Sequence, residues 1–214
     1  MNVLVFAPHN DDEILGVGGT IKKHINAGDD VYVVEATSGV HYKELQENAR
    51  KAHEYLGVKK TFFLNLPVCQ LANMNQMEIN AAIYEVVKEV QPEVAYIPFT
   101  GDMHSDHRVF AECAMVALRP IGDYSIRSIY MYETLSETGW NIPTPDKAFI
   151  PNAWVDITET IDDKLEAMSF YESQIREFPH PRSKESIIAL ARSRGTTIGV
   201  ECAESFMLIR HIVK

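Results

Sequence analysis

Two clusters of ionisable side chains have the residue types of a metal-dependent catalytic site. The first follows an apolar run at residues 3–7, where PHNDDE places His9, Asp11 and Asp12 close together. His9 and Asp12 are three positions apart, so in a helical turn both side chains point to one side. An imidazole and a carboxylate suit zinc, which accepts nitrogen and oxygen ligands. Asp11 lies between them and points elsewhere, which leaves it free to act as a base.

The second cluster follows another apolar run, at residues 93–99. There FTGDMHSDHRVF places His104, Asp106 and His107 at the start of a helical pattern. A lone histidine is usually structural or exposed, but a His-x-Asp-His spacing directly after a buried strand favours a functional cluster. The alternative is a polar loop in which Ser105 or Asp106 caps the next helix. The same alternative applies to the first cluster, where Asn10 or Asp11 would be the cap.

The hydrophobic pattern predicts a scaffold that brings the two clusters together. Apolar runs predict strands at residues 3–7, 31–36, 61–64 and 93–99. Helical periodicity covers residues 14–28, 41–56 and 76–90, and a further helical pattern follows His107. Such alternation predicts a mostly parallel α/β sheet, Rossmann-like, with helices on both faces. Right-handed crossovers place the carboxyl ends of its strands at one edge, where ligands bind.

The second half of the chain has a less regular pattern. Strands are predicted at residues 126–132 and 153–157, and the loop at 133–151 is expected to act as a lid. Residues 65–75 are expected to form a loop without regular structure. The length favours one domain over residues 1–214.

Two further helices are predicted near the end of the chain. One is expected to be capped by Thr158, and the other to run from Ser183 to residue 192. The charged run at 161–166 is interpreted as a solvated helix face. We expect residues 194–195 and 204–206 to lie in a tail that returns to the site.

Composition and charge exclude several classes of partner. The net charge of −10 argues against nucleic acid or an anionic membrane as the main partner. No signal peptide is recognised at the start, and no apolar run approaches the length of a membrane span. Three widely spaced cysteines without a CxxC pair are typical of reduced thiols, so a cytoplasmic location is expected.

The glycines after the first cluster raise the alternative of dinucleotide binding. The pattern G-x-G-x-x-G, counted from Gly16, requires a glycine at position 21, which is Ile21. A phosphate-binding turn should also lie between strand and helix, where this chain has histidine and aspartate. The glycines are therefore expected to let the first helix pack closely on the sheet.

The two motifs together resemble those of the PIG-L/LmbE-like deacetylases, which usually have His-Pro-Asp-Asp-Glu and His-Pro-Asp-His. Here Asn10 and Ser105 replace the two prolines, and neither position carries a ligand. The resemblance covers most of the chain. It extends to GVGGTI at 16–21, LGV at 56–58, Tyr132-Glu133, and a helix with Lys164, Tyr171 and Ser173-Gln174.

The resemblance implies zinc-dependent hydrolysis of the N-acetyl group of an N-acetylglucosamine-type sugar. By motif match, the Zn²⁺ ligands would be His9, Asp12 and His107, with an open position for water. Asp11 has the position of the family's base and would take the proton of that water.

His104 and Asp106 complete the set of residues that the resemblance implies. His104 would stabilise the tetrahedral oxyanion or protonate the departing amine. Asp106 would orient His104. Glu13 is expected to cap or pack, without a catalytic role.

Two further expectations come from the resemblance. Many members carry a substrate-facing arginine at the start of the second helix, where this chain has Leu45, so Lys43 or Arg50 could substitute. Some members form trimers or hexamers, and a homo-oligomer is expected here from exposed-looking aromatic residues. These aromatic residues are Tyr130, Tyr132 and Trp140, which could alternatively line the site or the core.

Two rival classes of function remain open at this stage. A phosphoesterase with two metals about 3.5–4 Å apart would need more carboxylates than the sequence offers beyond Asp11, Asp12 and Asp106. A non-catalytic sugar or nucleotide binder with this fold would have no need of the intact His and Asp clusters.

Overall fold

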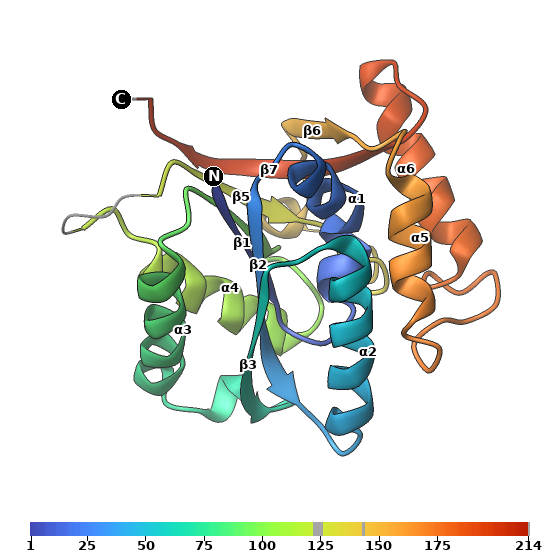
Figure 1. Cartoon of the computed structure of the whole chain (residues 1–214). Coiled ribbons are helices and arrows are strands. Elements are labelled where there is room, and N and C mark those ends of the chain that lie inside the picture. The colour runs from blue at the N-terminus through green and yellow to red at the C-terminus, as the bar shows by residue number, and fades with distance from the viewer. Residues whose placement is uncertain (122–125, 143, 214) are drawn as a thin grey trace.

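A seven-stranded sheet forms the centre of the protein in this computed structural model, which describes residues 1–121, 126–142 and 144–213. The strand order is β3-β2-β1-β4-β5-β7-β6 (Figure 1). The strands are β1 (Asn2–Ala7), β2 (Asp30–Ser38), β3 (Lys60–Pro67), β4 (Val94–Pro98), β5 (Ser128–Tyr132), β6 (Ala153–Asp156) and β7 (Ala203–His211). The first five strands are parallel, and only β7 is antiparallel to its neighbours β5 and β6.

Helices cover both faces of this sheet, as the sequence predicts. They are α1 (Asp12–Asn26), α2 (Tyr42–Leu56), α3 (Gln76–Val90), α4 (Ser105–Ala117), α5 (Ile161–Ser169) and α6 (Lys184–Ile198), with 3₁₀ turns at Leu71–Asn73 and Pro145–Lys147. Helices α3 and α4 lie on one face, and α1, α2, α5 and α6 lie on the other (Figure 1). Each face of the sheet has its own hydrophobic core, and alternate residues of β1 point into one or the other. Leu4 and Phe6 pack beneath α3 and α4, whereas Val3 and Val5 pack beneath α1. The mostly parallel α/β fold is therefore confirmed.

The glycines of α1 have the packing role that the sequence predicts. A Cβ atom at Gly16 would overlap the ring of Tyr132, and one at Gly19 would lie 2.8 Å from Ile157. Both positions let the helix approach the sheet and the segment after β6. Tyr132 is fully buried and donates a hydrogen bond to the carbonyl of Phe6, so it is a core residue and not an exposed one.

Two helices and one loop differ from their predicted boundaries. Helix α5 has Thr160 as its N-cap, because the Thr158 hydroxyl and backbone N–H already donate to Asp156. Helix α6 begins after Ser183, as predicted, and continues to Ile198, beyond the expected end at 192. The segment expected as a loop at 65–75 contains the end of β3 and a 3₁₀ turn.

The largest error concerns the end of the chain. Residues 204–206 belong to β7, which inserts between β5 and β6 and was predicted as an irregular tail. Glu204 accepts from the backbone N–H groups of Gly19 and Thr20, and its Oε1 lies 2.5 Å from Lys164 Nζ. Lys164 is only 4% exposed, so the charged run around it is not a fully solvated face. No helix in the described ranges is both long and apolar enough to cross a membrane.

Candidate metal centre and active site

The two predicted clusters meet at one edge of the sheet. Strands β1 and β4 are adjacent and parallel, with Val3 opposite Val94, so their carboxyl ends lie side by side. Helix α1 starts shortly after β1 ends, and α4 starts shortly after β4. The turns between strand and helix therefore bring the first cluster against the second.

Three side chains from these turns converge on a common point. His9 Nδ1 lies 3.2 Å from Asp12 Oδ2 and 3.3 Å from His107 Nε2. His107 Nε2 lies 3.1 Å from the same Asp12 oxygen. Asp12 and His107 are fully buried, and Asp12 Oδ1 has no hydrogen-bond partner among the described residues. Two imidazole nitrogens and a carboxylate are a ligand set that suits zinc, and these three residues could hold one ion.

A carboxylate lies close to the outer nitrogen of each histidine. Asp102 Oδ2 lies 2.9 Å from His107 Nδ1, and Asp106 Oδ2 lies 3.4 Å from His9 Nε2. This is the arrangement by which proteins orient metal-binding histidines, since the outer carboxylate fixes the tautomer and the ring. Asp102 was not expected from the sequence. Its position directly after a buried strand and before the His-x-Asp-His motif was the only available indication.

The electrostatics of this cluster favour a bound cation. Burial lowers the pKa of His107, but the carboxylates of Asp12 and Asp102 outweigh burial and raise it to about 10. Burial likewise lowers the pKa of His9, and Asp106 and Asp12 reverse the effect and raise it to about 9. The three carboxylates therefore draw positive charge to this point, which a metal ion would supply on displacing the protons. The residues present fit a divalent metal.

Asp11 points away from the three converging side chains, as its position between them predicts. It is the N-cap of α1 with φ of 113°, a left-handed conformation that is costly for a residue other than glycine. Its side chain makes no capping hydrogen bond, so the simple capping alternative does not describe it. Asp11 Oδ2 instead lies 3.2 Å from Nη1 of Arg182. Burial raises the pKa of Asp11 to about 8, although Arg182 acts in the opposite direction.

The Glu13 carboxylate stabilises the strained turn at Asp11 through a hydrogen bond to the backbone. The backbone N–H of Asp11 donates to Glu13 Oε2, and Tyr171 donates to Glu13 Oε1. His53 Nε2 lies 3.1 Å from the same Oε1. Glu35 lies beside His53, is fully buried, and has no hydrogen-bond partner for either oxygen among the described residues. Glu13 thus belongs to a buried polar cluster with Glu35 and His53 that supports the active-site turn.

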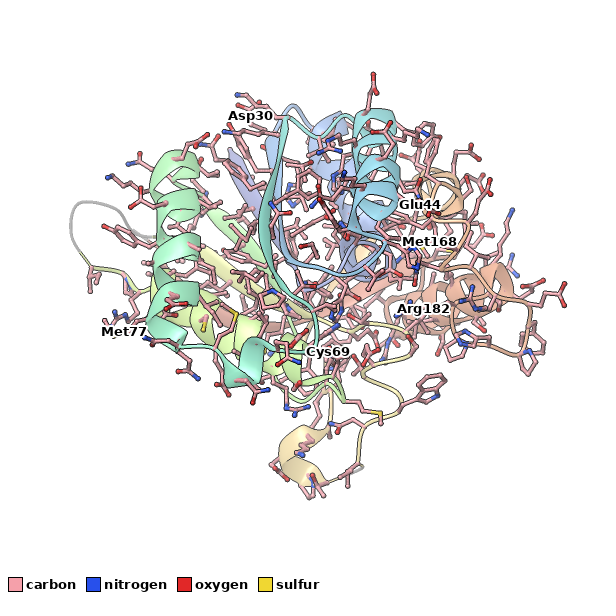
Figure 2. All side chains as sticks on the ribbon, turned by 90° about the horizontal axis from the view of Figure 1, so that it is seen from below. Asp30, Glu44, Cys69, Met77, Met168 and Arg182 are labelled. Carbon is pink, nitrogen blue, oxygen red and sulfur yellow. The ribbon has the colours of Figure 1, made fainter. Side chains whose placement is uncertain are left out.

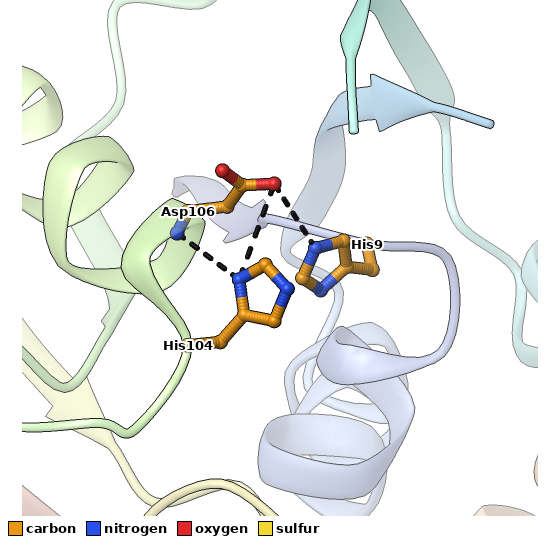
Figure 3. Close-up of side chains that lie close together, drawn as sticks. All are labelled: His9, His104 and Asp106. Carbon is orange, nitrogen blue, oxygen red and sulfur yellow. Dashed lines mark hydrogen bonds and ion pairs between the residues drawn. The ribbon is translucent and has the colours of Figure 1, made fainter. Parts of the chain in front are cut away.

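His104 lies beside His9 and Asp106 (Figure 3) and lines the pocket described below. Its Nδ1 accepts a hydrogen bond from the backbone N–H of Asp106, which leaves Nε2 as the protonated nitrogen when the ring is neutral. Burial, and then the neighbouring His9, lower the pKa of His104. The Asp106 carboxylate is 4.0 Å from His104 Nδ1 and accepts from the backbone N–H groups of Cys69 and Leu71.

An open pocket of about 330 Å³ gives access to the site. Its lining combines polar and apolar residues: His9, Asn10, Asp11, Thr37, Gly39, Val40, His41, Leu45, Val68, His104, Glu137, Gln174 and Arg182. Leu45 occupies the position expected for a substrate-facing arginine. Arg50 does not replace it, because its guanidinium lies 4.8 Å from the Phe63 ring and outside the lining. Lys43 is also outside the lining.

The loop at 133–151, which is expected to act as a lid, contacts the site through two of its residues. Glu137 lines the pocket, and Thr138 donates to Asp102 Oδ1. Residue 143 of this loop lies outside the described residues. The predicted approach of residues 194 and 204 to the site is wrong. Arg194 makes two hydrogen bonds to Glu133, and neither Arg194 nor Glu204 lines the pocket.

The chain is similar to two proteins described as diacetylchitobiose deacetylases. The diacetylchitobiose deacetylase of Thermococcus kodakarensis is 28% identical over 207 residues, which cover 82% of this chain and 70% of that protein. The N,N'-diacetylchitobiose deacetylase of Pyrococcus horikoshii superposes with a TM-score of 0.80 at 25% identity, covering 97% of this chain and 83% of that one.

Two further solved structures share this fold. The conserved protein TT1542 of Thermus thermophilus has a TM-score of 0.81 at 25% identity, with 99% of this chain and 96% of that chain covered. A 4-carboxy-2-hydroxymuconate hydratase, GalB, has a TM-score of 0.79 at 19% identity, which shows a common fold alone. The family model described as PIG-L, GlcNAc-PI de-N-acetylase, matches residues 4–118, which include both metal-site clusters. The chain therefore belongs to the PIG-L family of de-N-acetylases.

Proposed function

We propose that this protein is a zinc-dependent hydrolase that removes the N-acetyl group from an N-acetylglucosamine-type sugar. The observation that carries the proposal is the convergence of His9, Asp12 and His107, with His9, Asp11 and His104 lining one pocket. Two of its relatives are named as diacetylchitobiose deacetylases, which supports a sugar amide as the substrate class.

The metal would be held by His9 Nδ1, the Asp12 carboxylate and His107 Nε2. Zn²⁺ bound there would lower the pKa of a water ligand to about 7 and polarise a carbonyl oxygen. Asp102 and Asp106 would keep the two imidazoles in the correct orientation. In this proposal Asp106 acts on His9 through its carboxylate and on His104 through its backbone N–H.

Asp11 would take a proton from the attacking water. Water adds to the amide carbon, the C–N bond breaks, and the products are acetate and a free amino sugar. The Asp11 carboxyl would then pass this proton to the departing amine. One group would thus act as base and then as acid.

His104 is better suited to stabilise the oxyanion than to supply a proton. Its Nδ1 is occupied as an acceptor, so the neutral ring has an N–H at Nε2. The lowered pKa of His104 favours this neutral form. A single aimed donor of this kind typically contributes about 10²–10³ in rate.

The pocket lining favours a neutral polar substrate. The amides of Asn10 and Gln174 and the hydroxyl of Thr37 can bind sugar hydroxyls, and Arg182 is balanced by Asp11 and Glu137. Three free cysteines are consistent with action in a reducing compartment, and we propose the cytoplasm.

The test is release of acetate from a panel of N-acetylated sugars by the zinc-loaded protein. The panel contains N-acetylglucosamine, N,N'-diacetylchitobiose and N-acetylglucosaminyl-inositol, and Asp11→Asn is the negative control. Acetate release by the wild type, without release by Asp11→Asn, supports the proposal. Release of phosphate from phosphorylated sugars without release of acetate would favour the phosphoesterase alternative. Binding of sugars without any turnover would favour a non-catalytic binder.

A further inference from the structure

Arg182 reaches the active site from a part of the chain that neither sequence motif includes. It lies between α5 and α6, and its side chain is labelled in Figure 2. The segment that carries it packs near the loop after β5, since Arg182 Nε donates to Ser136 Oγ at 2.9 Å. The side chain is only 19% exposed and lines the pocket with Asp11 and His104.

Two of the three guanidinium nitrogens of Arg182, Nε and Nη1, donate hydrogen bonds to the protein, whereas Nη2 donates none to the residues that the structure describes. Nη1 donates to Gln174 Oε1 at 2.8 Å and lies 3.2 Å from Asp11 Oδ2. Nε is bound to Ser136, as stated above. In the described part of the chain, Nη2 makes no hydrogen bond, and its nearest carboxylate oxygen belongs to Glu137 at 4.0 Å. Since a guanidinium has five N–H donors, the two on Nη2 remain available.

The position of these free donors matters because the pocket has no other guanidinium. Among the described lining residues, Arg182 is the only arginine or lysine, and Leu45 is apolar. A guanidinium that is already anchored by Ser136 and Gln174 loses little conformational freedom on binding a further oxygen. Its planar geometry would also fix where that oxygen lies relative to Asp11.

We propose that Arg182 is a substrate-binding residue: Nη1 holds the Asp11 carboxylate in place, and Nη2 binds an oxygen atom of the N-acetyl sugar. This inference rests on the proposed function, because it names a residue that binds the substrate of that reaction. Arg182, between α5 and α6, would thus provide the substrate-binding guanidinium that is missing near the start of α2, where this chain has Leu45. The same arginine would thereby set the distance between the base and the sugar.

Two substitutions separate the two contacts. Arg182→Lys keeps a cation that can reach Asp11 but loses the planar pair of donors, so KM should rise by about tenfold with a smaller fall in kcat. Arg182→Ala removes both contacts, and kcat/KM should fall by about 100-fold. Guanidinium ion added at millimolar concentration should restore part of the activity of Arg182→Ala and none of that of Arg182→Lys.

Arg176 provides a matched control. It lies on the same segment and is exposed, and its side chain donates to the backbone carbonyls of Ser173 and Ile175. Its backbone N–H donates to the carbonyl of Arg182, a contact that substitution of the side chain leaves in place. Arg176→Ala should leave kcat and KM close to those of the wild type. Zinc content and melting temperature are measured for every variant, because a loss of rate that follows a loss of metal or of folding would overturn the inference. Activity close to wild type in Arg182→Ala would also overturn it.

Binding of N,N'-diacetylchitobiose, measured by calorimetry, distinguishes this inference from the proposed function. If the wild type binds the sugar but releases no acetate from any sugar tested, the proposed function is wrong. Arg182 is then judged on binding alone, which should weaken by about tenfold in Arg182→Ala and not in Arg176→Ala. If the wild type neither binds nor cleaves any of the sugars, both proposals are wrong.

Discussion

Asp102 and His107 form a buried carboxylate–imidazole pair directly behind the candidate metal site. Oδ2 of Asp102 lies 2.9 Å from Nδ1 of His107, and both side chains are fully buried. With Nδ1 donating to the carboxylate, the lone pair of Nε2 is directed toward Asp12 and His9. The other oxygen of Asp102 accepts from the Thr138 hydroxyl, so the loop after β5 helps to fix the orientation of the pair.

Substitution of Asp102 should weaken metal binding, although it removes no metal ligand. We expect Asp102→Ala to lower zinc affinity by about 10–100-fold, the usual effect of losing such an outer partner. Competition with a chromophoric chelator measures the affinity. Asp146→Ala, at an exposed aspartate of the 3₁₀ turn Pro145–Lys147, is the control and should leave it unchanged. Equal zinc affinity in Asp102→Ala and the wild type would show that His107 needs no such support.

The neighbouring aspartates Asp11 and Asp12 should differ in what their substitution removes. Asp11→Asn should keep its zinc and lose about 10²–10⁴ in turnover, or about 3–5.5 kcal/mol of barrier, because it removes a base. Asp12→Asn should lose zinc and turnover together, because it removes a charged ligand. Zinc content measured beside acetate release checks both outcomes. Loss of zinc in Asp11→Asn would contradict this division of roles.

Glu35 should make the stability of the protein depend on pH. Burial, and then the charges of Glu13 and Asp11, raise its pKa well above the usual value. The native state therefore keeps a proton that the unfolded state releases above its pKa of about 4.3, so the free energy of unfolding falls as pH rises through this window.

Substitution by glutamine removes this dependence. We expect the stability difference between Glu35→Gln and the wild type to shift in favour of the variant from pH 5 toward pH 9. Urea unfolding at several pH values in this range measures it. Glu89→Gln, at an exposed glutamate of α3, should follow the wild type throughout. A constant difference between Glu35→Gln and the wild type would mean that Glu35 is charged in the folded protein.

Gly16 should not tolerate a side chain. An added methyl group would overlap the buried ring of Tyr132, and overpacking of this kind typically costs about 1–3 kcal/mol. Gly139→Ala is a matched control, because a Cβ atom there has no neighbour within 4 Å. Thermal unfolding should therefore show a lower melting temperature for Gly16→Ala alone. A similar melting temperature for the two variants would mean that the Tyr132 ring can move aside.

The local sequence was sufficient to predict those features whose residues are close together in the chain. His9, Asp11 and Asp12 share one turn, so their spacing alone indicated which side chains point together. The alternation of apolar runs with helical periods likewise predicted the parallel strands β1 to β4, and with them the meeting of the two clusters. These features depend on backbone geometry over a few residues, which the sequence specifies directly.

Tertiary structure decided everything that depends on partners distant in the chain. Arg182 and Glu35 have no local pattern that distinguishes them from surface residues, and only packing brings one to Asp11 and buries the other. Lys164 is buried only because Glu204 of β7 neutralises it, and β7 itself is placed by pairing with β5 and β6. The free energy of a buried charge depends on which opposite charges surround it, and those neighbours are fixed only when the whole chain has folded.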